Sequence, residues 1–159
     1  MKCFFPRRIL HISTISSVVG VALTSSLALA GSVDRVWGTV EVDSNNSVIQ
    51  VQASSGPNGE NAQGSFSHKE GSIQHSGDVT CLSVIGKWAV VGGVITESNL
   101  PNAQGTTYLL FINENSKDEG TRVATLSGYT PVPGPTCPSP VQLEGLIANK
   151  GKIVVQDKN

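Results

Sequence analysis

Two histidines in the stretch "SFSHKEGSIQHSGD", His68 and His75, are the side chains best suited to acid–base or metal chemistry. If Glu70 and Gly71 form a two-residue hairpin turn, the two histidines lie diagonally on one face, near enough to contact one metal ion. A zinc ion takes three or four ligands, however, and Glu70 and Asp78 have the wrong parity or lie beyond the strand. We therefore expect half-exposed strand histidines, no metal site and no cofactor.

The stretch "NENSKDEG" is rich in side-chain oxygens that calcium could use, namely those of Asn113, Asn115, Asp118 and Glu119. Its spacing lacks the D-x-[DN]-x-[DN]-G register of calcium loops, and Lys117 stands in its middle. The composition is more typical of a solvated, charged turn.

Nucleophilic catalysis has no recognisable motif in the chain. The patterns G-x-S-x-G, HExxH and G-x-x-x-x-G-K-[ST] are all absent from the sequence. A pair of carboxylates such as glycosidases use stays open, because its two members have no fixed spacing along a chain. We leave enzymatic activity uncertain and favour a non-catalytic protein.

The chain has three cysteines, and two of them, Cys81 and Cys137, lie beyond the N-terminal segment. Neither has a CxxC partner, which argues against zinc. Cys137 stands in "GYTPVPGPTCPSPV", where five prolines predict an irregular loop, because proline cannot donate to a strand ladder. We expect a Cys81–Cys137 disulfide that ties this proline loop to a core strand, with two free thiols as the alternative.

The N-terminus resembles a secretory signal peptide. Its first ten residues carry three Lys and Arg, an apolar stretch follows, and that stretch ends in the small-residue pattern "ALA". We expect a signal helix over residues 1–30, cleavage between Ala30 and Gly31, and one secreted domain over residues 31–159 in a periplasmic or extracellular compartment. An uncleaved membrane anchor is the alternative, since the apolar stretch is long enough to span a bilayer.

Removal of the signal leaves eight Lys and Arg against twelve Asp and Glu. This mildly acidic balance gives no electrostatic footprint for nucleic acid or for anionic lipid. We expect no nucleic-acid partner and no stable membrane insertion after cleavage. A ligand in the envelope or the extracellular space fits the composition, but the sequence does not identify that ligand.

Short alternating runs separated by turn residues predict an all-β fold. "VWGTVEV" places Val36, Val40 and Val42 on one face, whereas "WAVVGGVITE" and "TTYLLFIN" are apolar on both faces, as in central or covered strands. We expect an antiparallel small barrel or sandwich of about 8–9 strands. Trp37 falls on the polar face of its strand. It could be an exposed aromatic that stacks on a sugar ring, but we expect the proline loop to cover it.

The order of three stretches, "HSGDVTCLSVIGKWAVVGGVIT", "TTYLLFINEN" and "PTCPSPVQLEGLIANKGKIVVQD", resembles a family of small exported bacterial all-β domains without an assigned activity. The shared pattern is TCLxVxGxxAxxGGV followed by a C-terminal GxIxVxD, and the resemblance covers residues 61–157. The longer loop "NENSKDEGTR" and the segment "ANKGKIVV" depart from the family pattern. The resemblance implies the fold and export, and it supplies no catalytic residue.

These observations rank three functions. A non-catalytic secreted β-domain that binds a ligand or serves as a structural module comes first. A small-molecule carrier barrel is the alternative, because Gly38, Gly92 and Gly93 could leave interior space open. A hydrolase without a recognisable motif comes third.

Overall fold

The computed structural model describes residues 33–114, 120–129, 137–140 and 145–158, and in them it contains nine strands and one short 3-10 turn. The expected signal segment, most of the proline loop and residues 115–119 of the charged turn lie outside the described residues. The strands are β1 (Asp34–Val42), β2 (Ser47–Ser55), β3 (Gln63–Glu70), β4 (Ile73–Ile85), β5 (Trp88–Ser98), β6 (Thr107–Asn113), β7 (Arg122–Tyr129), β8 (Leu146–Ile147) and β9 (Lys150–Gln156). The predicted all-β class is confirmed.

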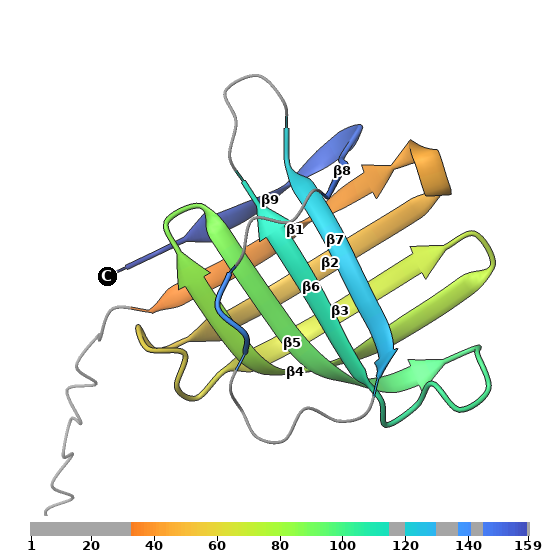
Figure 1. The fold of residues 1–159 in the computed structure, drawn as a ribbon, viewed down its shortest axis with the longest axis horizontal. Helices are drawn as coiled ribbons and strands as arrows, with labels where there is room; N and C mark the ends of the chain where they lie inside the picture. Colours follow the sequence, from red (N-terminus) through yellow and green to blue (C-terminus); the bar gives the residue numbers. More distant parts are fainter. Residues whose placement is uncertain (1–32, 115–119, 130–136, 141–144, 159) are drawn as a thin grey trace, which may run out of the picture.

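All nine strands form a single antiparallel sheet in the order β8-β7-β6-β5-β4-β3-β2-β1-β9. The sheet curls into a half-barrel, so that β1 to β3 cross behind β5 to β7 (Figure 1). The apolar core lies between these two halves of the sheet, because each strand turns one face toward it. The sequence left a small barrel and a sandwich open, and the structure is a single sheet curled into a half-barrel.

The alternation of β1 and β2 shows how the sequence directs this arrangement. Val36 and Val40 on β1 are fully buried, whereas Trp37 and Glu41, the residues that follow them, are exposed. β2 pairs with β1 antiparallel and buries Ile49, Val51 and Ala53 on the same inner face. The period of two therefore separates an apolar inner face from a polar outer face along both strands.

Strand β5 is buried on both faces, as its sequence predicts. It pairs with β4 on one side and β6 on the other, and Val90 and Val91 are both at most 1 % exposed. Val91 belongs to the core cluster between the sheet halves. Val90 lies on the opposite, outer face and is fully buried there.

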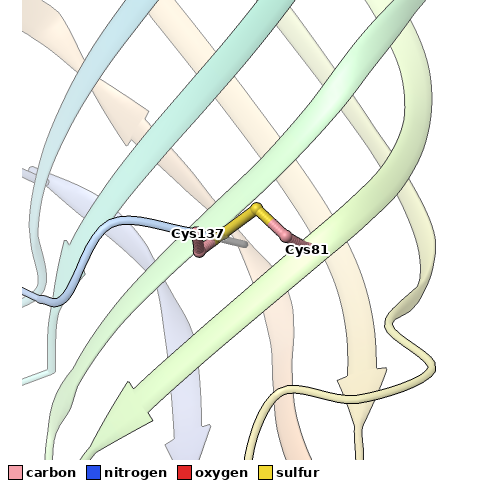
Figure 2. The surroundings of a disulfide bond; sticks show 2 residues. All are labelled: Cys81 and Cys137. Carbon is pink, nitrogen blue, oxygen red and sulfur yellow. A yellow bond between two sulfur atoms is a disulfide. The ribbon is translucent and has the colours of Figure 1, made fainter. Parts of the chain in front are cut away.

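The predicted disulfide joins Cys81 on β4 to Cys137, with 5.3 Å between the two Cα atoms. Figure 2 shows the bond reaching from β4 over the outer face of the neighbouring strand. Gly92 of β5 makes room for it, because a Cβ there would lie 2.5 Å from Cys81 Sγ and 3.2 Å from Cys137 Sγ. The bond attaches the end of the proline loop to the middle of the sheet.

The predicted turn at Glu70–Gly71 is wrong by one residue. Glu70 pairs with Ile73, so the two-residue loop is Gly71–Ser72. Gly71 has a φ of 58°, and a positive φ at the first loop position favours glycine over glutamate. The shift changes every cross-strand pair of the hairpin.

The last strand holds the open side of the half-barrel together. β9 pairs with β1, and its Val155 N–H donates to Glu114 Oε2 at 2.7 Å, just beyond the end of β6. Lys87 and Lys152 also contact this carboxylate, each at 3.0 Å. Burial acts to raise the pKa of Glu114, but these hydrogen bonds and charges lower it below its usual value.

Candidate functional site

The outer face of β1, β2 and β3 carries a groove of about 670 Å³ beside Trp37. The indole is 41 % exposed, so the expectation that the proline loop covers it is wrong. The described end of that loop is attached at Cys81 on β4 instead. Trp37 is thus an exposed aromatic among the polar side chains of the groove.

Strand register aligns the groove residues in two rows. Trp37 pairs with Gln52, which in turn pairs with Ser65 on β3. The next row on the same face contains Arg35, Ser54 and Gln63. Because side chains on one face repeat at every second residue, these six side chains point to the same side of the sheet. Short serines between longer side chains leave the hollow.

The polar groups of this groove are available for a ligand. Within the described residues, Arg35, Gln52 and Gln63 make no side-chain hydrogen bond or ion pair, and all three are exposed. Arg35 supplies donors, and each glutamine supplies both donors and an acceptor. Among the described residues that line the groove, Arg35 alone is charged.

A second hollow of about 380 Å³ continues the groove across the sheet. It shares Gln52 and Ser65 with the first and reaches Asp78 on β4 and Glu97 on β5. Together the two hollows form a polar track over β1 to β5, which we call the outer groove. It runs across the strands rather than along them.

The two candidate histidines lie inside the half-barrel. His68 and His75 pair directly across β3 and β4, not diagonally, and they are 6 % and 5 % exposed. The expectation of half-exposed histidines is therefore wrong. The one-residue shift of the turn makes the pairing direct, and both rings are buried because they lie on the same inner face as Phe66.

Each imidazole is held by a serine, on opposite sides of the pair. His68 Nε2 contacts Ser47 Oγ on β2 at 2.9 Å, and His75 Nδ1 contacts Ser98 Oγ on β5 at 2.8 Å. The rings are thus directed to different neighbouring strands, an arrangement that does not favour one shared metal ion. In the described part of the chain, no group of three or more His, Cys, Asp or Glu residues is placed to hold a metal.

This end of the interior is unusually polar. The Tyr108 ring lies 5.8 Å from that of His68, and the buried Tyr108 hydroxyl has no hydrogen-bond partner among the described residues. Asn45 donates to Glu70 at 2.9 Å, while its own buried oxygen has no partner there. A cavity of about 230 Å³ lies beside Asn45 and His68. This space is about a third of the volume of the groove beside Trp37.

Burial determines the protonation of the histidine pair. Loss of water lowers the pKa of both imidazoles below the ordinary value of 6.5, and the neighbouring His75 lowers that of His68 further. The Glu70 carboxylate acts in the opposite direction on His68. Both rings are therefore neutral in the folded protein at neutral pH.

We predict that stability falls as the pH drops below 6.5. Below this pH the unfolded chain binds protons at both histidines, whereas the folded chain does not. The free energy of unfolding therefore decreases as the pH falls, and its slope against pH corresponds to a difference of up to two bound protons. Replacing both residues, as His68→Gln with His75→Gln, should flatten this dependence between pH 7.5 and 5.5. Urea unfolding at a series of pH values measures it. Equal slopes for the two proteins would contradict the assignment.

Only the two ends of the charged turn belong to the described residues. Asn113 is buried at the end of β6, and residues 115–119 lie outside the described residues. Glu114, between them, is engaged by Lys87, Lys152 and the β9 backbone. No helix in the described segments is long and apolar enough to span a membrane.

Comparisons with family models, with curated proteins and with solved structures find no significant match for this chain. The resemblance to exported bacterial β-domains therefore stays a prediction. The case for a function rests on the geometry of the site.

Proposed function

We propose that this chain is an exported, non-catalytic binding module and that it binds its ligand in the outer groove. The observation that carries the proposal is Trp37, an exposed aromatic at the edge of a groove whose polar side chains have no partners of their own. Exposed aromatic residues beside unsatisfied polar groups are frequent in binding sites.

Export is part of the proposal. A disulfide between Cys81 and Cys137 fits an oxidising compartment, because cytosolic thiols are kept reduced. The signal peptide over residues 1–30, cut after Ala30, would deliver the domain to the envelope or the extracellular space. The resemblance to exported β-domains supports the same destination.

The interior supports this proposal over a small-molecule carrier. Valine, leucine and isoleucine side chains from both halves of the sheet fill the space between them. The interior cavity beside His68 measures about 230 Å³, below the roughly 300–1,000 Å³ of usual ligand pockets, whereas the groove beside Trp37 lies within that range.

Binding to the surface of the producing cells tests the proposal. Fluorescently labelled protein, purified from the exported fraction, should bind envelopes saturably, and Trp37→Ala should weaken this binding at least tenfold. Val48→Ala is the matched control, because Val48 is a similarly exposed apolar residue on the outer face of β2 but outside the groove. The melting temperatures should stay within a few degrees. Equal binding by Trp37→Ala and the wild type, or no saturable binding, would refute the proposal.

A further inference from the structure

The recognition mode of the outer groove is limited by the sheet beneath it. Strands β1, β2 and β3 are each paired on both sides, so their backbone N–H and C=O groups are already engaged. A peptide therefore cannot add to them as an extra strand, which is the usual way a sheet binds an extended peptide. Only the side chains on this face are left to contact a ligand.

Those side chains offer one flat apolar surface surrounded by hydrogen-bonding groups. The Trp37 indole makes no aromatic contact with another described ring. Around it stand Arg35, Gln52 and Gln63, together with the serines of the two rows. A ligand that matches must have an apolar face and a rim of groups that both donate and accept hydrogen bonds. A pyranose ring has this distribution, with C–H groups on its faces and hydroxyls at its edge.

The charges along the outer groove argue against a polyanionic ligand. Arg35 is the only cation among the described residues of the groove beside Trp37, and the continuation of this groove contains Asp78 and Glu97. Nucleic acids and anionic polymers need several Lys and Arg residues to neutralise their charges. A neutral polar ligand fits this distribution better.

From these three observations we infer that the outer groove binds an oligosaccharide of two or more rings. One ring stacks on Trp37 and is hydrogen-bonded by Arg35, Gln52 and Gln63. The following rings continue over Ser65 toward Asp78, across the strands. The inference deepens the proposed function and rests on it.

Tryptophan fluorescence tests the stacking directly. The chain has two tryptophans, so Trp88→Phe leaves Trp37 as the only reporter. Cellohexaose and chitohexaose serve as probes beside a broader glycan array, with glucose and N-acetylglucosamine as the short controls. We expect at least one glycan to change the Trp37 emission saturably, and its hexamer to bind at least tenfold more tightly than its monomer.

Variants assign the roles of the groove residues. In the wild-type background, Trp37→Ala should abolish glycan binding and Gln52→Ala should weaken it several-fold. Trp37→Phe should restore most of it, because a stacking aromatic ring is retained. Val48→Ala should bind as the wild type does.

Chemical treatment of the envelopes separates this inference from the proposed function. Periodate cleaves the vicinal diols of sugars and leaves the polypeptide backbone intact, whereas a protease does the reverse. Binding that is lost after periodate and survives protease supports the oligosaccharide, even if no glycan on the array binds. Trp37-dependent binding that survives periodate and is lost after protease overturns the oligosaccharide and leaves the binding module standing. Absence of any Trp37-dependent binding overturns both.

Discussion

Replacing both Cys81 and Cys137 with serine should lower the free energy of unfolding by about 4 kcal/mol, the chain-entropy value for a loop of this length. The two residues are 56 positions apart, so the bond removes much conformational freedom from the unfolded chain. Five residues of the proline loop have no backbone N–H to donate, and the covalent link is the described attachment of this loop to β4. Because small domains have only about 5–15 kcal/mol of stability in total, the loss is a large fraction of it.

Chemical unfolding of the exported protein, with and without reductant, measures this effect. Reduction should lower the stability of the wild type to that of the double serine variant and should leave the variant unchanged. The far-ultraviolet β signal of the variant should persist at low temperature. The thiols of the wild-type chain from residue 31 onward can be titrated after unfolding without reductant. Two reactive thiols per chain would show that the bond does not form and would contradict the prediction.

The disulfide is also the clearest case of what the sequence could predict. Once the expected signal segment is set aside, two cysteines allow a single intramolecular pair, and such a pair would persist in the oxidising compartment that the sequence predicts. The faces of β1 and β2 were equally predictable, because Val36 and Ile49 begin strict alternations that survive in the structure. Composition and periodicity act locally, so no knowledge of the remaining chain was needed.

Register was the first property that local reasoning missed. Moving the turn from Glu70–Gly71 to Gly71–Ser72 placed His68 directly opposite His75 instead of diagonal to it. Both turns contain a glycine, and what separates them is the loop position at which a positive φ is needed. A one-residue error in a hairpin therefore changes the chemistry assigned to its side chains.

The outer groove was missed for a related reason. Arg35, Gln52 and Gln63 are separate polar residues on three strands, and each looks like an ordinary outward position in its own strand. They form one surface only because the register of β1, β2 and β3 brings them together. Trp37 was the only signal in the sequence, since a large aromatic residue on a polar face is unusual.

The curl of the sheet depends on contacts between distant residues in the same way. Glu114 engages the backbone of β9 across 41 positions of sequence, and no local pattern identifies such a partner. Inside the curl, the Phe66 and Tyr108 rings stack with centroids 4.4 Å apart and an interplanar angle of 8°. Phe66 lies on the backbone of β4 and β5, where Gly77 and Gly93 leave room for it. A Cβ on either glycine would lie within 2.7 Å of the ring.

This packing makes Phe66→Ala the core substitution with the largest expected effect. Truncation of a buried phenylalanine to alanine lowers the free energy of unfolding by about 3–5 kcal/mol, and we expect the upper part of this range for Phe66. The cost is high because the space left by the ring is bordered by Gly77 and Gly93, which have no side chains to move into it. Tyr108 also loses its stacking partner, while its buried hydroxyl gains none.

Urea unfolding of Phe66→Ala beside Val48→Ala measures the cavity effect against an exposed control. Val48 is 38 % exposed, so its truncation should change stability by no more than about 0.5 kcal/mol. Because an apolar cavity stays dry and takes up small apolar molecules, benzene should raise the melting temperature of Phe66→Ala and leave the wild type unaffected. A loss below about 1 kcal/mol without a benzene effect would mean that the sheet closes over the vacated space. That outcome would contradict the prediction that Gly77 and Gly93 leave a cavity beside the removed ring.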